Sequence, residues 1–577
     1  MALFGKQKSL LSRNKCRTLF FEVYNWYKKN WRELFSKELD SLERDLKQFD
    51  QAIVSNDRAA ANAHVEKFTL FKSRYIKKSP LKTALETIFC IAGALAVALV
   101  LRLVWFESMV IPTGSMRPTY REEDHLFVSK DAFALNIPGA TDHLYFDPAL
   151  LERTDVVIWS GDGIDLPDTH STFLGVIPWE KRYIKRLMGQ PGDTVYFYGG
   201  ELYTLDRDGQ NVTSTYRHPW MERLDHVPIL SFEGERLRPK YDELTGRLQS
   251  ITFEQMHQPI GRLTFGSDRK NMTGEVFDGK EWIKDDPQAA KTPHEQIKTY
   301  SDFFGISNYA KARLLTPEQY TSMTDEKSEG DAKLVLELQH TPYLSSKGVE
   351  FYSVGLGRES LHFTPHKSYL PLNQAHLDRL MDTLYTIRFV VTNQRAVPYG
   401  EEEGTPTLNR PVLPGVPDGT YEFYYGKLYQ VGWMGFLTEL PDSHPLASRS
   451  AENIQKLFNL GIEMHLDFDP ARGTGQIPSR FAYFRNGDFY VMGGSVLNRD
   501  DPTLKAFLEK ENAAAAKESA YVPFVDRGPP SEETIRAFGV KVPEDHYLLL
   551  GDNYSRSADS RIFGFVPSAN LQGVPSI

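Results

Sequence analysis

Cysteine is almost absent from this chain. Its 577 residues include only Cys16, near the amino terminus, and Cys90, inside an apolar segment. The two positions would lie at different depths, so we expect no disulfide between them. A long cysteine-free remainder is compatible with a domain that folds outside the cytosol without disulfides, but it does not define the compartment.

Strong net charge and metal-binding patterns are also lacking. The net charge of −9 is modest for this length and gives no reason to expect a nucleic-acid partner. His340, His362 and His366 stand without a supporting set of further ligands, so each is interpreted as a surface or packing histidine. We therefore expect no metal and no cofactor, and we find no internal repeat.

Long apolar runs are represented once, from about Thr87 to Phe106. Twenty helical residues at about 1.5 Å each reach about 30 Å, the thickness of a bilayer core. Ser79 and Pro80 offer an N-cap and a first-turn proline for this helix. A buried core helix is the alternative. The segment begins too far into the chain for a cleavable signal peptide, so it predicts an uncleaved signal anchor.

Lysine and arginine are distributed unequally around the predicted span. Five basic residues lie close before it, namely Lys72, Arg74, Lys77, Lys78 and Lys82. On the other side, Arg117 and Arg121 are accompanied by several acidic residues. The positive-inside rule therefore predicts a cytoplasmic amino terminus and an external location for everything after the span.

The residues before the span show helical periodicity. Apolar side chains recur every three or four residues from Leu39 to Ile53, and a second run passes through Phe68 and Phe71. A break at Ser55–Asp57 separates the two runs. This pattern predicts a cytoplasmic helical hairpin within residues 1–79, either self-packed or used for docking or oligomerisation.

After the span, short apolar runs bounded by turn residues predict a mainly β domain. Such runs occur at 126–128, 156–159, 194–197, 388–391, 421–424, 489–492 and 547–550. We expect a transmembrane segment at 80–106, a β-rich core split between 107–198 and 541–577, and a large α+β insertion at 199–540.

Two segments carry the chemistry. Ser115 lies in a Thr-Gly-Ser-Met sequence just after the span, and Lys185 follows about 70 residues later beside Tyr183, Ile184 and Leu187. A serine hydroxyl needs a neighbouring base to become a nucleophile. Lysine can be that base when burial depresses its pKa towards neutrality.

Each of these residues has a simpler explanation when taken alone. Ser115 would be a turn serine, Lys185 a solvated surface charge, and Asp559 with Arg561 an exposed ion pair. A nucleophile elbow of the α/β-hydrolase type is excluded because Arg117 stands where its last glycine would be. Only the joint occurrence of the segments favours a catalytic interpretation.

Three separated blocks together resemble the bacterial type I signal peptidases, also called leader peptidases. The blocks are Ser115–Thr119; Arg182–Arg186 with Pro191-Gly192-Asp193; and Gly551-Asp552-Asn553 with Ser557–Arg561, Gly564 and Val566-Pro567. The resemblance covers roughly a quarter of the chain. It implies a β-rich catalytic core of antiparallel sheets with a conical barrel.

The resemblance also implies a role for each matching residue. Ser115 matches the nucleophile and Lys185 the general base, while Thr113 and the Ser115 amide match the oxyanion hole. Ser557 matches a serine that hydrogen-bonds the lysine, and Asp559 with Arg561 match a supporting ion pair. By the same analogy, five residues line the substrate pockets: Met109, Ile111, Pro112, Tyr120 and Ile184.

The implied function is removal of signal peptides from exported preproteins with A-x-A cleavage sites, through an acyl-enzyme. The implied location is the bacterial inner membrane, crossed once, with the catalytic domain on the periplasmic face. The expected partners are these preproteins and the lipid bilayer, and the secretion translocon is a candidate. Two alternatives stay open: a self-cleaving Ser/Lys protease and a non-catalytic membrane scaffold. The role of the insertion, and whether a final strand is missing or replaced after Pro567, are also open.

Overall fold

The computed structural model describes most of the chain, and the account below is confined to these residues. They are 10–34, 36–76, 80–138, 140–166, 169–173, 177–227, 231–232, 240–242, 245–286, 309–328, 330–353, 359–386, 388–399, 412–459, 480–518, 520–554 and 557–576. The chain divides into two compact units, Met1–Val100 and Leu101–Ile577.

Three helices form the amino-terminal part of the first unit: α1 (Arg13–Asn30), α2 (Ser36–Val54) and α3 (Arg58–Tyr75). Asp57 caps α3 by accepting a hydrogen bond from the Ala60 amide. Cys16, Val23, Phe49 and Phe68 are buried in one apolar cluster that all three helices share. The structure therefore adds α1 to the two helices that the sequence pattern predicts.

Helix α4 (Pro80–Val104) contains the long apolar run. Among the described residues, one stretch is long and apolar enough to cross a membrane, Ala84–Arg102, with a mean hydropathy of 2.3. None of that stretch is buried against the rest of the protein, which disfavours the core-helix alternative. Ser79, Lys77 and Lys78 lie outside the described residues.

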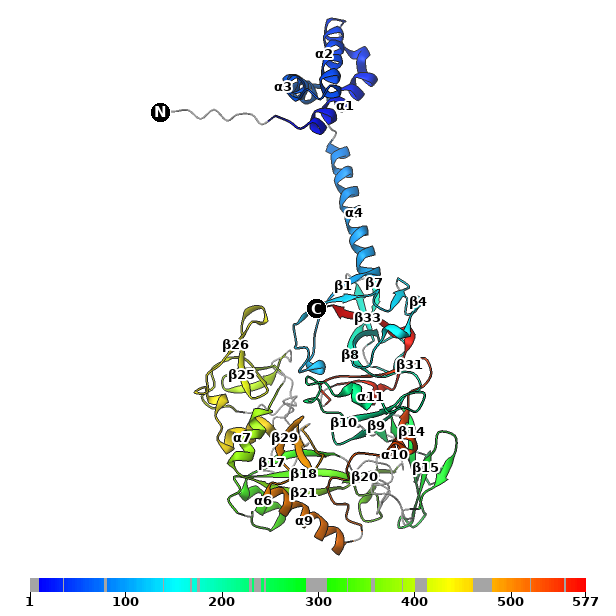
Figure 1. Cartoon of the computed structure of the whole chain (residues 1–577), viewed down its shortest axis with the longest axis vertical. Helices are drawn as coiled ribbons and strands as arrows, with labels where there is room; N and C mark the ends of the chain where they lie inside the picture. Colours follow the sequence, from blue (N-terminus) through cyan, green and yellow to red (C-terminus); the bar gives the residue numbers. More distant parts are fainter. Residues whose placement is uncertain are drawn as a thin grey trace. The chain divides into compact units, whose positions relative to one another are not determined.

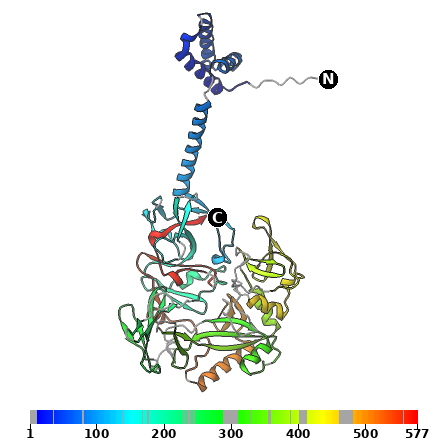
Figure 2. The same cartoon turned by 180° about the vertical axis from the view of Figure 1, so that it is seen from behind.

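A seven-stranded antiparallel sheet forms the centre of the second unit. Its order is β1-β2-β33-β5-β8-β31-β32, which leaves β1 and β32 as end strands of an open half-barrel (Figures 1 and 2). The strands are β1 (Phe106–Val110), β2 (His125–Ser129), β33 (Leu571–Ser576), β5 (Val156–Ser160), β8 (Arg182–Gly189), β31 (His546–Leu550) and β32 (Val566–Pro567). The last described residues thus form an interior strand of this sheet, between β2 and β5.

Smaller sheets extend this core. Their strands are β3 (Ala134–Asn136) with β4 (His143–Phe146), β6 (His170–Phe173) with β7 (Ile177–Glu180), and β9 (Thr194–Tyr198) with β10 (Glu201–Leu205) and β30 (Val540–Lys541). Helices α10 (Glu532–Phe538) and α11 (Ser560–Phe563) lie just before and after β31 in sequence.

The insertion contains three further antiparallel sheets. The first has β11 (Ser231–Phe232), β12 (Lys240–Tyr241), β13 (Leu248–Gln255), β14 (Gln258–Phe265), β15 (Met272–Phe277) and β16 (Trp282–Lys284). The second has β21 (Pro365–Leu372), β18 (Leu334–Pro342), β17 (Ala310–Leu315), β27 (Phe481–Arg485), β28 (Asp488–Val491) and β29 (Gly494–Leu497). The third, called the insertion sheet below, has β23 (Arg395–Pro398), β22 (Phe389–Thr392), β24 (Gly419–Tyr424), β25 (Lys427–Val431) and β26 (Leu437–Glu439).

One large apolar core joins the second sheet to the insertion sheet and to helices on them. It contains residues from α7, α8 and α9, together with buried side chains such as Leu336, Phe389 and Phe423. The remaining elements are the hairpin β19 (Val349–Ser353) with β20 (Glu359–Phe363), and the helices α6 (Pro317–Thr324), α7 (Gln374–Asp382), α8 (Ala451–Asn459) and α9 (Pro502–Lys517). The insertion is therefore a folded α+β body with its own core.

Short 3-10 turns connect several of these elements. They are η1 (Trp31–Glu33), η2 (Gly114–Met116), η3 (Pro148–Leu150), η4 (Thr213–Tyr216), η5 (Trp433–Gly435), η6 (Pro445–Ala447) and η7 (Ser568–Asn570). Turn η2 carries Ser115 and follows directly on the edge strand β1.

Candidate active site

Ser115 lies in turn η2, between the extended residue Thr113 and the buried side chain of Met116. The turn is held from the other end of the chain by Asn553. The Asn553 backbone N–H donates to the Ser115 carbonyl at 3.1 Å, and its side-chain Nδ2 donates to the Gly114 carbonyl at 3.0 Å. These bonds fix the backbone of the turn and leave the Ser115 side chain only half-buried.

Lys185 approaches Ser115 from β8, where it pairs with Val157 of β5. Its Nζ lies 3.0 Å from Ser115 Oγ and also donates to the Ile184 carbonyl at 2.9 Å. Lys185 is only 4% exposed. This burial lowers the pKa of Lys185 to about 8, against a smaller opposing effect of Asp559 and Asp552. A minor neutral fraction of the amine is therefore available near neutral pH, and it grows as the pH rises through about 8.

The third sequence block forms a wall of the site around a buried ion pair. Arg561 donates from Nε to Asp559 Oδ1 and from Nη2 to Asp559 Oδ2, both at 2.9 Å, and neither residue is exposed. Arg561 also donates to the carbonyls of Tyr554 and Val227, and Asp559 accepts from the Gly551 amide. The pair is therefore a buried structural unit and not the exposed pair of the simpler interpretation.

Gly551 occupies a position with no room for a side chain. A Cβ atom there would lie 2.7 Å from the Ser115 carbonyl oxygen and 2.1 Å from Ser557 Oγ. Because neither neighbour is the flexible end of a long side chain, a larger residue would push the Ser115 turn away from this wall.

Ser557 is buried at the same wall, but the structure does not form the hydrogen bond that the resemblance implies for it. Ser557 Oγ has no hydrogen-bond partner among the described residues, while Lys185 Nζ donates to Ser115 and to Ile184. A buried hydroxyl without a partner is uncommon and costs free energy, so this atom is available to another donor or acceptor.

The residues expected to line the substrate pockets fall into two groups. Ile111, Ile184, Met109 and Tyr120 belong to one apolar cluster that also includes Met116, next to Ser115. Pro112 and Thr113 are exposed beside it. A largely buried apolar cluster therefore lies next to the turn that carries Ser115.

Asp552, to which the sequence analysis assigns no role, also contributes to the site. Arg186, the residue after Lys185, donates from Nε to Asp552 Oδ1 at 2.8 Å and from Nη2 to Asp552 Oδ2 at 2.5 Å. Thr119 donates to the same carboxylate. The Gly551-Asp552-Asn553 motif could have indicated a role for Asp552. The motif alone does not show that Arg186 and Thr119 are its partners.

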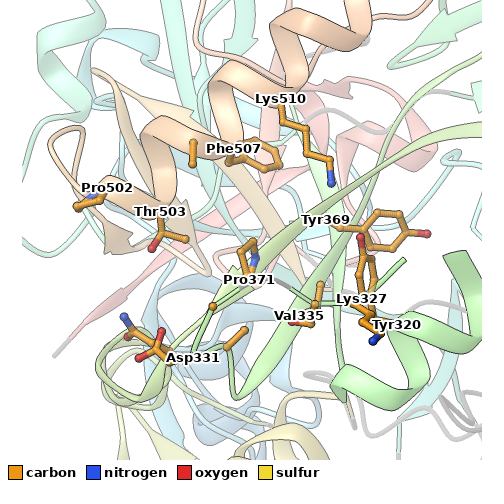
Figure 3. A pocket seen from close by; sticks show the side chains of 15 residues that line it. Tyr320, Lys327, Asp331, Val335, Tyr369, Pro371, Pro502, Thr503, Phe507 and Lys510 are labelled. Atoms are coloured by element: carbon orange, nitrogen blue, oxygen red, sulfur yellow. The ribbon is translucent and has the colours of Figure 1, made fainter. Parts of the chain in front are cut away.

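Other cavities lie away from these residues. One of about 360 Å³ is lined by Tyr320, Lys327, Tyr369, Phe507 and Lys510, among others, all of them in the insertion (Figure 3). No residue of the candidate site lines it. Within the described ranges, no cluster of three or more His, Cys, Asp or Glu side chains could hold a metal ion.

Comparison with known proteins supports the same interpretation. A model of the family described as signal peptidase, peptidase S26, matches residues 84–264 and 484–577. The similarity to the S26 signal peptidase family is therefore confined to these two segments. They contain the span, Ser115, Lys185 and the third block, whereas the part of the insertion between 265 and 483, including the whole insertion sheet, lies outside the match.

Similar curated proteins carry the corresponding name. Signal peptidase I of Rickettsia bellii (strain OSU 85-389) is 32% identical over 121 residues, which are 20% of this chain and 38% of that protein. Signal peptidase I of Rickettsia prowazekii (strain Madrid E) is 29% identical over 133 residues, 22% of this chain and 45% of the relative. The probable signal peptidase I-1 of Synechocystis sp. is 31% identical over 138 residues, 24% of this chain and 59% of the relative. The alignments thus span about half the length of these relatives.

Proposed function

We propose that this chain is a membrane-anchored serine endopeptidase that removes signal peptides from exported preproteins. The observation that carries the proposal is the 3.0 Å contact between Lys185 Nζ and Ser115 Oγ in a site that keeps the lysine buried. Similarity of the two matched segments to the S26 family and the names of the relatives support the same activity.

The proposed reaction begins with the neutral amine of Lys185. Lys185 takes the proton of the Ser115 hydroxyl while Oγ attacks the scissile carbonyl carbon. The Ser115 amide and the Thr113 hydroxyl donate to the oxyanion. The tetrahedral intermediate then breaks its C–N bond, and the Lys185 ammonium gives its proton to the leaving amine. Water, deprotonated by Lys185, hydrolyses the acyl ester and releases Ser115.

Two strand edges near Ser115 are open, which favours a substrate that binds in an extended conformation. In the described ladders, β1 pairs only with β2, and the Arg182–Lys185 part of β8 pairs only with β5. A substrate strand could add to either edge and present its carbonyl to Ser115. The apolar cluster at Ile111 and Ile184 suits the small apolar side chains of an A-x-A site.

The position of the candidate membrane span favours cleavage of substrates at a membrane surface. The candidate span Ala84–Arg102 ends only a few residues before β1, which leads into the Ser115 turn. We propose that the catalytic unit acts on the outer face of the bacterial inner membrane, with the bilayer and exported preproteins as partners and the translocon as a candidate neighbour. The Ser115–Lys185 contact disfavours the scaffold alternative.

The test is cleavage of a purified preprotein with an A-x-A site by the detergent-solubilised full chain. We expect cleavage after the last small residue, and a loss of at least about 1,000-fold in Ser115→Ala and in Lys185→Ala. Ser322→Ala and Lys541→Ala, at exposed positions away from the site, are matched controls that should keep parental rates. Undiminished cleavage by Ser115→Ala would show that another group performs the reaction.

A further inference from the structure

A cluster of six charged residues joins the segment after Ser115 to the insertion sheet. Four come from the segment and two from the insertion: Arg117, Arg121, Glu122 and Glu123, with Arg388 and Glu422. Three positive and three negative side chains make the cluster neutral as a whole. We call these six residues the charge cluster.

Glu422 is the centre of the charge cluster. It lies on β24 and is completely buried. Its Oε2 accepts hydrogen bonds from Arg117 Nη2 at 2.8 Å and from Arg388 Nε at 3.2 Å, and its Oε1 lies 3.3 Å from Arg121 Nε. One carboxylate of the insertion therefore binds two arginines, Arg117 and Arg121, of the segment that follows Ser115.

Arg117 connects Glu422 to the nucleophile. It is 1% exposed and stands two residues after Ser115, separated from it only by the buried Met116. Its backbone N–H donates to the Gly114 carbonyl at 3.1 Å and closes the turn that carries Ser115. Its guanidinium lies between Glu122 and Glu422. Movement of the Arg117 side chain would therefore be transmitted to the turn.

Further contacts from the insertion sheet reach the same segment. The guanidinium of Arg121 lies 4.4 Å from the ring centre of Tyr424. Arg388 donates to Glu123 Oε2 at 2.9 Å, and the Tyr399 hydroxyl donates to the other oxygen of that carboxylate. The insertion sheet thus holds residues 117–123 at several points, next to the catalytic sheet (Figure 1).

We infer that Glu422 is a positioning residue: through Arg117 it fixes the turn that presents Ser115 to Lys185, so that the insertion completes the active site. This inference rests on the proposed function. Stability alone is a weak reason to bury such a cluster, because apolar residues of similar volume often stabilise a protein equally well. A geometric role accounts for its contacts with Arg117, whose backbone N–H closes the turn that carries Ser115.

The test measures preprotein cleavage by the full-length Glu422→Gln variant. This change keeps the size and one acceptor oxygen but removes the charge that holds the guanidinium groups. We expect kcat to fall about tenfold, within the loss of about 100-fold that a 1 Å misplacement can cause, while KM stays within about twofold of the parental value. The matched control is Glu439→Gln, an exposed carboxylate on β26 of the same sheet paired with Lys427, which should keep parental kcat.

A double-variant cycle tests the route through Arg117. If Glu422 acts through Arg117, Arg117→Gln combined with Glu422→Gln should lose no more activity than the more impaired single variant. A folded Glu422→Gln protein with parental kcat, a loss confined to KM, or fully additive losses would overturn the inference.

Folding is checked by the thermal midpoint and by resistance to limited proteolysis. Should Glu422→Gln fail to fold, the paired variant Arg117→Met with Glu422→Leu removes both opposite charges together, and the inference expects a folded protein with reduced kcat. Parental kcat in that folded pair would overturn it. An inactive parent chain would instead contradict the proposed function.

Discussion

Two buried cations near Ser115 have different surroundings and therefore different uses. Lys185 Nζ donates to two neutral oxygen atoms, Ser115 Oγ and the Ile184 carbonyl, so burial is the main influence on its pKa. Arg561 is instead bound by both oxygen atoms of Asp559. The first arrangement suits proton transfer, and the second suits a fixed structural support.

The pKa of Lys185 predicts how cleavage depends on pH. Burial lowers this pKa to about 8, so the amine is protonated and inactive as a base well below pH 8 and neutral above it. The single-turnover cleavage rate should therefore rise with pH through about 8 and level off above it. Rates are compared after incubation at each pH, with remaining activity measured at a common pH. A constant rate from about pH 6 to 9 would contradict Lys185 as the base.

The Asp559–Arg561 pair predicts a large effect on stability. Replacing Asp559 with Ala leaves a fully buried guanidinium without its carboxylate, and we expect the free energy of unfolding to fall by about 3–5 kcal/mol. The exposed pair Arg207–Glu544 is the matched control, since Glu544→Ala should cost less than about 1 kcal/mol. Urea unfolding of the detergent-solubilised proteins measures both. Equal effects of the two substitutions would contradict the structural role of Asp559.

At the scale of elements, local pattern predicted some strands well and others poorly. The run at 156–159 is apolar throughout and does not alternate between polar and apolar residues. It forms β5 in the middle of the catalytic sheet. Strand β33 was not predicted, because its sequence Leu-Gln-Gly-Val-Pro-Ser contains Gly573 and Pro575, which disfavour strands. Its place is determined by tertiary packing: a Cβ on Gly573 would lie 2.3 Å from the Ser129 carbonyl oxygen.

The central place of β33 predicts the result of truncation. It pairs with β2 through residues 574–576 and with β5 through Leu571 and Gly573. Ending the chain after Asn570 would open the sheet between these two strands, and we expect a protease-sensitive, inactive protein. Ending it after Ser576 keeps every described β33 pairing and should preserve the thermal midpoint and activity. A folded, active protein that ends at Asn570 would show that β33 is dispensable.

At the scale of the molecule, the site is assembled from distant parts of the chain. The sequence blocks sufficed to predict that Ser115, Lys185 and the block beginning at Gly551 lie together, as their hydrogen bonds show; their joint action in catalysis stays a prediction. The Arg117–Glu422 contact joins residues 305 positions apart, and nothing local marks Glu422 as different from any other strand carboxylate. A contact between residues so far apart in sequence can be seen only in the folded structure. The same holds for the Ser557 hydroxyl, which has no hydrogen-bond partner among the described residues.

The last prediction concerns the orientation of the whole chain in the membrane. The basic residues before the span, among them Lys72 and Arg74, predict that helices α1 to α3 lie in the cytoplasm and that the residues after the span lie outside. In a background with Cys16→Ala and Cys90→Ala, a single cysteine at the exposed position Ser322 should react with a membrane-impermeant thiol reagent applied to the periplasmic side.

A single cysteine at the exposed position Gln48 of α2 should react only after the inner membrane is permeabilised, which also proves that its thiol is accessible. Labelling of the Gln48 position alone in sealed cells would reverse the orientation. Ser115 would then face the cytosol. An emerging signal peptide reaches its processing site on the other face of the membrane, so that result would contradict the proposed function together with the topology.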